Sequence, residues 1–267
     1  MVDLRVLSLG AGVQSTTLAL MIEHGELPMV DCAIFSDTMS EPKKVYEHLD
    51  WLEKQLSYPI YRVSRGNLKN DLIKSSNNEK TKGSIPAFTK NRETGKKGIL
   101  RRHCTQDYKI QPLIKKIREL LGVGYKQRVP KDKKVTQIFG ISLDEMIRMR
   151  TSPIKYITYE YPLVKKEIRR HHCLEWMEQK GYPKPPRSAC TFCPYHSNEE
   201  WKSIKENKEE WDEAVALDKK IREGIRGTKD QLFLHKSLVP LDEAELDPNK
   251  DQQDLFNDIC DDGMCGV

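Results

Sequence analysis

Short apolar runs alternate with amphipathic stretches along the first half of the chain. The runs at residues 4–9, 30–35, 60–64 and 135–141 are rich in Val, Ile, Leu and Phe. They have the length and the continuity of strands that are buried on both faces. Between them, apolar residues recur three or four positions apart, which indicates helices with one buried side. This order predicts an α/β fold built on a doubly wound, mostly parallel sheet.

Residues 74–102 interrupt this pattern, because they are polar and basic and contain glycines and a proline. A structureless loop of this length in a compact domain is typical of a lid or a binding loop. We expect a basic flap that faces the substrate, with a merely solvated loop as the alternative. The prediction for the whole chain is an α/β domain at 1–163 carrying this flap, a mainly helical, Cys-containing extension at 164–247 and a mobile tail at 248–267.

Composition narrows the class of protein. The chain has 32% charged residues, and none of its apolar runs approaches the length of a membrane span. Its first residues lack the charged segment that precedes the apolar part of a signal peptide. We therefore expect a soluble, cytoplasmic protein with no membrane partner. The net charge of +5 favours an anionic partner, for which a nucleotide or a nucleic acid would serve.

Small residues crowd the turn that follows the first predicted strand. Ser8, Gly10, Gly12 and Ser15 lie between that strand and the next helix. Glycines let the backbone approach a ligand, and the first amides of a helix are unsatisfied donors at the positive end of its dipole, so the turn can seat an anion. The Gly-Lys-Ser/Thr step of a Walker loop and the third glycine of a dinucleotide-binding turn are both missing. A glycine-tightened turn without a ligand is the alternative.

This turn resembles the PP-loop of the adenine-nucleotide α-hydrolase superfamily. That superfamily includes ATP pyrophosphatases, enzymes that insert sulfur into tRNA and DNA, and PAPS reductases. Gln14 stands where the SGGxDS form of the loop has an aspartate.

Further segments resemble PAPS-reductase-like proteins in the same order along the chain. Residues 35–52 are similar to the DTG-x-x-x-P-x-x-Tyr segment, with Met39 in place of the glycine. Residues 140–148 are similar to G-x-R-x-x-E-S-x-x-R, with Ser142 in place of the first arginine. Tyr161-Pro162-Leu163 and the helix after them are similar to the strand-and-helix unit that follows.

The resemblance implies a Rossmann-like nucleotide-binding domain that binds ATP or a related adenine nucleotide, with Mg²⁺. Asp37 is expected to contact the ribose or the metal ion and to act in catalysis, and Arg148 to hold an anionic group. In the alternative reading, Asp37 or Thr38 simply caps the helix that begins near Pro42. The residues that the resemblance places at the nucleotide are Ser8, Gly10, Ala11, Gly12, Gln14, Ser15, Asp37, Thr38, Gly140, Glu145 and Arg148.

Seven cysteines, without a signal peptide, favour metal binding or thiol chemistry over a disulfide scaffold. Cys190-x-x-Cys193 has the spacing of metal ligands, and we expect Cys104 and Cys173 to complete the set. Four thiolates would hold zinc or a [4Fe–4S] cluster, and their spacing does not choose between the two. The resemblance favours the cluster, with zinc as the alternative. A bare thiol pair, or a Cys173 that is only a buried apolar residue, stays open.

PAPS reductases end in a mobile tail with a nucleophilic cysteine, which Gly263-Met264-Cys265-Gly266 resembles. Cys265 is therefore a catalytic candidate, with Cys260 as a resolving thiol. Asp261 and Asp262 would raise the pKa of the Cys265 thiol. An inert or metal-binding end is the alternative.

The resemblance implies an enzyme, and sulfur transfer is the leading hypothesis. ATP would activate an acceptor oxygen as an adenylate, and sulfur would arrive through the cluster or through a cysteine persulfide. The expected partners are an adenine nucleotide, a tRNA or DNA held by the flap, a sulfur donor, and a second copy of the chain in a homo-oligomer. One alternative is a PAPS or APS reductase with Cys265 as nucleophile and a thioredoxin-like reductant, against which Ser142 argues. The other is a non-catalytic, metal-stabilised nucleotide-binding module.

Overall fold

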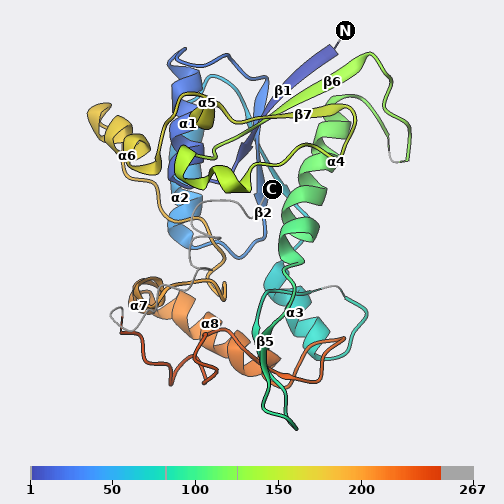
Figure 1. Ribbon diagram of the computed structural model, residues 1–267, viewed down its shortest axis with the longest axis vertical. Helices are drawn as coiled ribbons and strands as arrows, with labels where there is room; N and C mark the ends of the chain where they lie inside the picture. The colour runs from blue at the N-terminus through green and yellow to red at the C-terminus, as the bar shows by residue number, and fades with distance from the viewer. Residues whose placement is uncertain (1, 82, 125, 248–267) are drawn as a thin grey trace.

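The computed structural model describes residues 2–81, 83–124 and 126–247 (Figure 1). The expected tail at 248–267, with Cys260 and Cys265, lies outside the described residues. Within the described residues, none of the helices combines the length and the apolar character that a membrane crossing requires.

Five parallel strands form the central sheet, in the order β3-β2-β1-β6-β7. They are β1 (Val2–Leu9), β2 (Cys32–Asp37), β3 (Ile60–Ser64), β6 (Lys133–Phe139) and β7 (Ile157–Glu160). The chain steps outward from β1 to β3 and then returns to the other side of β1 at β6. The predicted doubly wound, parallel α/β fold is therefore confirmed. The strand order reverses between β1 and β6, and ligands of such sheets bind at this switch point, beyond the carboxyl ends of the strands.

The central sheet has an apolar core on each of its two faces. Leu7 points towards the cluster formed by α1 (Val13–Glu23), α2 (Lys43–Glu53) and α6 (Arg170–Gln179), whereas its neighbour Val6 packs with α4 (Gln111–Leu120). Successive strand residues point to opposite faces, so each apolar strand serves both clusters. Cys32 is 2% exposed, as expected of a core residue. The short α5 (Pro162–Lys165) follows β7.

A second core lies beyond the carboxyl edge of the sheet, in the lower part of Figure 1. Its largest fully buried side chains are Trp201, Tyr108 and Phe192. A small antiparallel sheet, β5-β4-β8, flanks it. The elements of this part are α3 (Leu68–Ser76), β4 (Phe88–Lys90), β5 (Lys97–Ile99), the π-helix η1 (Thr105–Ile110), α7 (Asn198–Glu206), α8 (Lys208–Ile221) and β8 (Gln231–Phe233).

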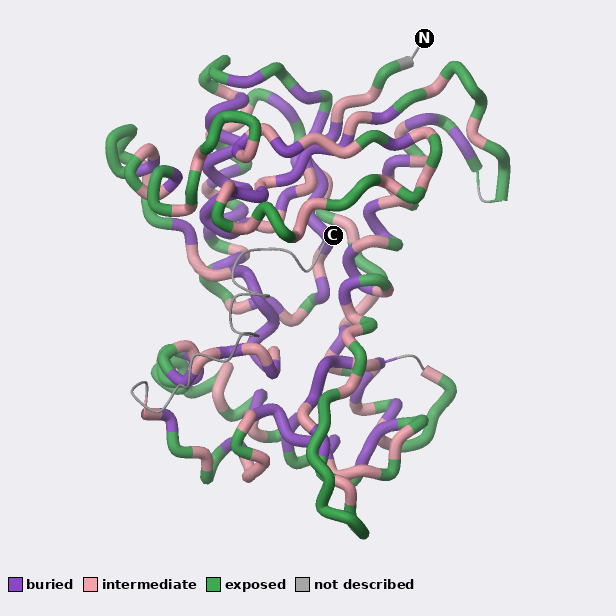
Figure 2. Tube along the Cα trace, in the orientation of Figure 1, coloured by how far each residue is buried: buried purple, intermediate pink, exposed green. Residues whose placement is uncertain are grey.

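The structure corrects the expectation of a structureless flap at 74–102. That segment contains the end of α3 and a β4–β5 hairpin, and β4 pairs with β8 from the far end of the chain. Within this segment, residues 77–80 and residues 92–99, which form the hairpin turn and β5, are continuously exposed (Figure 2).

The two cores also divide the chain differently from the expected boundary at residue 163. Apolar residues between 68 and 108 pack with residues 190–246, while α6 packs on α1.

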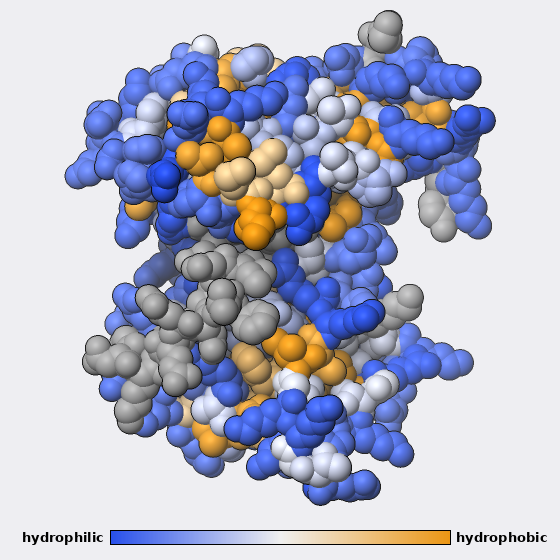
Figure 3. All heavy atoms as spheres, viewed as in Figure 1, coloured by the Kyte–Doolittle hydropathy of each residue, from blue (hydrophilic) through white to orange (hydrophobic). Residues whose placement is uncertain are grey.

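On the face shown in Figure 3, hydrophilic side chains dominate and apolar ones form separate patches.

Candidate functional site

The first turn of α1 presents backbone amides and no acidic side chain at the carboxyl edge of the sheet. β1 ends at Leu9, and Gly10, Ala11 and Gly12 carry the chain into the helix. Ala11 has a left-handed backbone (φ 59°), and it is completely buried. Gly12 is the N-cap, and the first helical residues, from Val13 to Thr16, are uncharged. The helix amides therefore point beyond the carboxyl edge of β1, at the switch point of the sheet, where their dipole favours a phosphate.

Gly140 brings the end of β6 against this turn. A Cβ atom at Gly140 would lie 2.7 Å from the Cα atom of Ser15 and 2.8 Å from its nitrogen. On the neighbouring strand, Ser8 Oγ accepts a hydrogen bond of 2.9 Å from Gln137 Nε2. Ser8, Ser15 and Gly140, all predicted from the sequence, therefore lie together at the switch point.

Gln14 is held by residues that follow β6. Its side chain is buried, and Nε2 donates to Ser142 Oγ (3.3 Å) and to Glu145 Oε2 (3.2 Å). Glu145 forms an ion pair with Arg148 in η2 (Leu143–Arg148). Burial raises the pKa of Glu145, and the charge of Arg148 opposes that shift. Gln14, Glu145 and Arg148 thus form one network beside the loop, and a direct contact of Arg148 with an anionic group stays a prediction.

Asp37 ends β2 in a tight turn at the same edge of the sheet. Its Oδ1 atom accepts hydrogen bonds from the Met39 amide (2.6 Å) and from the Tyr46 hydroxyl (2.9 Å). Met39 has a left-handed backbone (φ 55°), a conformation that glycine adopts more readily than methionine. Burial and the charge of Asp37 raise the pKa of Tyr46. The N-cap of α2 is Pro42, so Asp37 shapes this turn and does not cap the helix.

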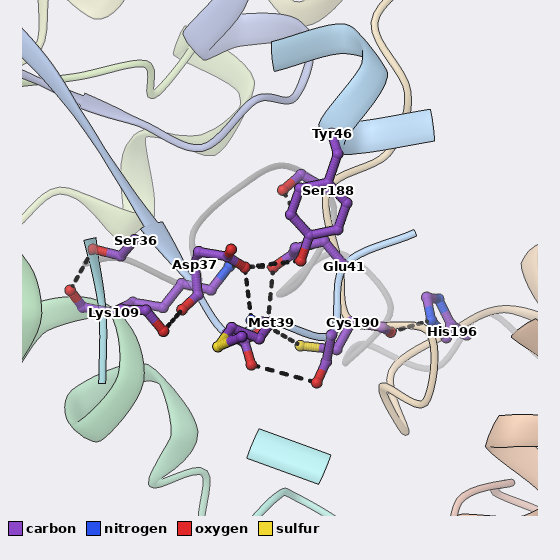
Figure 4. A network of polar contacts seen from close by, with 12 residues as sticks. Ser36, Asp37, Met39, Glu41, Tyr46, Lys109, Ser188, Cys190 and His196 are labelled. Atoms are coloured by element: carbon purple, nitrogen blue, oxygen red, sulfur yellow. Dashed lines mark hydrogen bonds and ion pairs between the residues drawn. The ribbon is translucent and has the colours of Figure 1, made fainter. Parts of the chain in front are cut away.

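Three cysteines meet at one small cavity next to this turn. Cys104, Cys190 and Cys193 line a space of about 20 Å³ together with Thr38 and Lys109. The Thr38 hydroxyl oxygen lies 3.1 Å from the Cys190 sulfur (Figure 4). The residue that follows Asp37 therefore lies both at the carboxyl edge of the sheet and at the thiol cavity.

His196 contacts this group from outside the cavity. Its Nε2 atom lies 2.9 Å from the Cys190 carbonyl oxygen, and burial lowers the pKa of the imidazole to about 3. The ring is therefore neutral at physiological pH.

The structure does not bring Cys173 to this cavity. Cys173 lies in α6, fully buried in the core shared with α1, and its carbonyl oxygen accepts a hydrogen bond of 3.4 Å from Thr17 Oγ1. Burial raises the pKa of its thiol to about 12. This placement is that of a buried apolar residue.

The cavity offers a metal three thiol donors. Three thiols from two segments are the right kind of donor for zinc or an iron–sulfur cluster. Yet among the described residues, no group of three or more His, Cys, Asp or Glu side chains is placed so that it could hold a metal ion. The thiols fit in kind but not in position, so no chemical step below is routed through a metal.

A buried ion pair beside the cavity was missed by the sequence analysis. Lys109 Nζ lies 2.9 Å from Glu41 Oε1, and the two side chains are 7% and 0% exposed. Glu41 also accepts from Ser188 Oγ at 3.4 Å. Lys109 belongs to the π-helix η1, and such helices occur frequently at functional sites. In the sequence, the feature that could have indicated this ion pair is Lys109, a lysine next to Tyr108 at the start of an amphipathic helical segment.

Comparison with known proteins gives a distant likeness. No protein-family model matches the chain, and no curated protein sequence matches it. Among solved structures, the chain is similar to a phosphoadenylyl-sulfate (PAPS) reductase from Candida auris in complex with phosphate. The identity is 13%, the TM-score is 0.42, and the match covers 68% of this chain and 74% of that one. At this level the likeness carries no argument about chemistry.

Proposed function

We propose that the protein is an adenine-nucleotide-using enzyme of the PP-loop type that transfers sulfur to a nucleic-acid acceptor. The observation that carries this proposal is the contact between Thr38 and Cys190, at 3.1 Å. Thr38 follows Asp37 at the carboxyl edge of the sheet, where the α1 amides favour a phosphate group. A nucleotide at this edge and the thiols of the cavity would therefore be neighbours.

The first step activates the acceptor. With ATP phosphates on the amides of Gly10–Gly12, an acceptor carbonyl oxygen attacks the α-phosphorus, and the bond to pyrophosphate breaks. Preorganised amides stabilise the negative charge of the leaving pyrophosphate. Asp37 is proposed to act on the nucleotide at the same edge, where a Mg²⁺ ion would supply further positive charge to the phosphates.

The second step replaces oxygen by sulfur. A sulfide ion attacks the activated carbon, and AMP leaves with the acceptor oxygen, so no oxidation or reduction is needed. If the donor is a persulfide on one cavity thiol, a second cysteine must attack the sulfur–sulfur bond that joins product and protein. That route leaves a protein disulfide, which an external thiol reductant reopens. Cys104, Cys190 and Cys193 are proposed to supply these thiols.

A [4Fe–4S] cluster, with zinc as the alternative, is a competing proposal for the same cysteines, which fit a metal in kind but not in position and which, as ligands, would not serve as the thiols of the second step. Iron and acid-labile sulfide, measured on protein purified without oxygen, test it. About four of each per chain would support the cluster. Zinc without sulfide would make the cavity a structural site, and the absence of both would leave the thiols alone to do the chemistry.

The function itself is tested by pyrophosphate release and sulfur incorporation, measured with ATP, sulfide and a tRNA or DNA acceptor. We expect Cys190→Ala to keep pyrophosphate release and to lose sulfur incorporation. Cys173→Ala is the matched control, because it removes a buried thiol far from the cavity, and it should keep both activities. Thiol-dependent sulfite release from a sulfonucleotide, or nucleotide binding without turnover, would overturn the proposal.

A further inference from the structure

Among the described helices, α4 alone packs on its face of the sheet, and it leaves a wide groove beside it. The groove has a volume of about 1540 Å³ and runs between α4 and residues 150–159. Pockets for small ligands are usually about 300–1,000 Å³. Lys115 and Arg118 stand on the α4 wall, and Arg150 and Tyr159 on the other. A groove of this size suits a segment of a polymer.

Apolar side chains supply most of the surface of the groove, and the charged residues among its lining are mostly basic. Its two acidic residues are already paired, Asp107 with Arg65 at 3.2 Å and Glu119 with Lys116 at 2.7 Å. The basic residues that line it are Arg65, Lys115, Arg118, Lys126 and Arg150. Positive charge therefore exceeds negative charge along the groove.

Backbone carbonyls orient two of these guanidinium groups without cancelling their charge. Arg118 donates to the carbonyl oxygens of Gly124 (2.8 Å) and Gln127 (2.6 Å). Arg150 donates to those of Ile147 and Met149, both at 2.9 Å. Fixed cations at both walls match the regularly spaced phosphates of a nucleic-acid strand.

The groove opens at the edge where the chemistry is proposed. Ser64 belongs to its lining, and Ser64 Oγ donates to the Asp37 carbonyl oxygen at 2.8 Å. The helix η1 serves both sites, because Gln106 lines the groove while Lys109 lines the thiol cavity.

We propose that this groove binds single-stranded nucleic acid, which rests on the proposed function and locates its acceptor. The cationic walls would hold phosphates. The half-buried ring of Tyr159, which already meets the Phe139 ring edge-on at 4.9 Å between centroids, is the aromatic side chain of the lining against which a base would stack. The hairpin suits this role less well. Its Arg92 is engaged by Glu223 at 2.7 Å, and the hairpin lies at the opposite end of the molecule from the central sheet (Figure 1).

Fluorescence anisotropy with a labelled single-stranded RNA of about 16 nucleotides tests the groove. The double variant Lys115→Glu/Lys126→Glu reverses two exposed charges of the lining. We expect it to weaken binding by about tenfold or more and to lower the slope of log K against log salt by about 1.4.

Two controls make the same change of charge elsewhere. Lys44→Glu/Lys54→Glu alters an exposed residue of α2 and its exposed C-cap, on the other face of the sheet, and Lys96→Glu/Lys97→Glu alters the hairpin. Both should bind RNA nearly as the wild type does. Equal weakening in all three variants would reduce the effect to net charge and overturn the proposal, and loss in the hairpin variant alone would move the site to the hairpin.

Nucleotide binding separates this proposal from the function on which it rests. ATP affinity of the groove variant, measured by calorimetry, should equal that of the wild type. RNA binding in the groove without ATP binding in any variant would overturn the proposed function and keep the groove. If ATP is turned over but the groove variant binds RNA as the wild type does, the proposed function stands and the groove proposal is overturned.

Discussion

At Gly140, the absence of a side chain lets the end of β6 lie against the first turn of α1. The atoms that a Cβ would meet, at 2.7 and 2.8 Å, are backbone atoms of Ser15 and have no rotamer through which to move away. We therefore expect Gly140→Ala to lower the free energy of unfolding by about 1–3 kcal/mol and to weaken nucleotide binding. Urea unfolding and ATP calorimetry measure the two effects.

Gly124→Ala is the matched control for this substitution. Its added Cβ would meet the flexible side chain of Gln127 at 3.1 Å, which can move aside. An equal loss of stability or of ATP affinity in both variants would contradict the importance of the close approach at Gly140.

His48 makes stability depend on pH. Its Nε2 atom lies 2.9 Å from Thr16 Oγ1, and burial lowers its pKa from 6.5 to about 4. Between these values the unfolded chain binds a proton that the folded chain does not, so the free energy of unfolding falls as the pH is lowered. The expected loss is about 3 kcal/mol at most, and buried His196 acts in the same direction.

His48→Gln should therefore be less stable at pH 7 but lose less stability between pH 6.5 and 4. Urea unfolding at several pH values measures this slope. His171→Gln, at an exposed position of α6, is the control. A slope in His48→Gln as steep as that of the wild type would refute the assignment.

Among single residues, sequence reasoning placed the residues at strand ends and at the helix start more easily than it identified the residues against which each side chain packs. Ser8, Ser15 and Gly140 could be placed at one edge, because strand ends and a helix start fix where they lie. Cys173 could not be placed, since a cysteine in an amphipathic helix reads equally as a ligand or as core. The position of α6 on α1 decided it.

At the scale of elements, η1 joins the sheet to the second core through one buried ion pair. Removing Lys109 alone would leave the Glu41 carboxylate buried without its cation. We expect Lys109→Met to lower the free energy of unfolding by about 3–5 kcal/mol, and Lys109→Met/Glu41→Leu to recover a large part of it. Urea unfolding of both variants measures this difference.

The exposed pair Lys208–Asp212 in α8 provides the comparison. Its side chains are 87% and 58% exposed, so Lys208→Met should cost less than about 1 kcal/mol. A double variant no more stable than Lys109→Met would show that packing, and not the unpaired charge, is responsible.

Helices and strands with a clear pattern of apolar residues could be predicted from the sequence. Short strands that form only by pairing with a distant segment could not. The third strand of the sheet begins and ends where the apolar run predicted it, at Ile60–Ser64. Strands β4, β5 and β8 have three residues each, which is too short for an alternating pattern to emerge. Their pairing joins residues 88–90 to 231–233, and nothing local in either segment indicates the other.

At the scale of the whole molecule, both cores are assembled from segments that lie far apart in the sequence. Leu68, Leu72 and Tyr108 pack with Phe192 and Trp201 beyond the carboxyl edge of the sheet. A boundary read from the sequence separates these partners, because hydrophobic patterning shows which residues are buried but not against what. The thiol cavity shares this origin, since Cys104 meets Cys190 and Cys193 only when both parts are present.

The predicted boundary at residue 163 can be tested directly with two fragments. Residues 1–163 lack α6 over α1 and lack the C-terminal half of the second core, so both apolar surfaces would face water. We expect this fragment to bind the dye ANS and to show no cooperative thermal unfolding by circular dichroism. Residues 1–247 retain both cores and should unfold cooperatively. A cooperative transition in residues 1–163 would show that the α/β part folds alone and that the second core is an appendage, as the pattern along the chain first suggested.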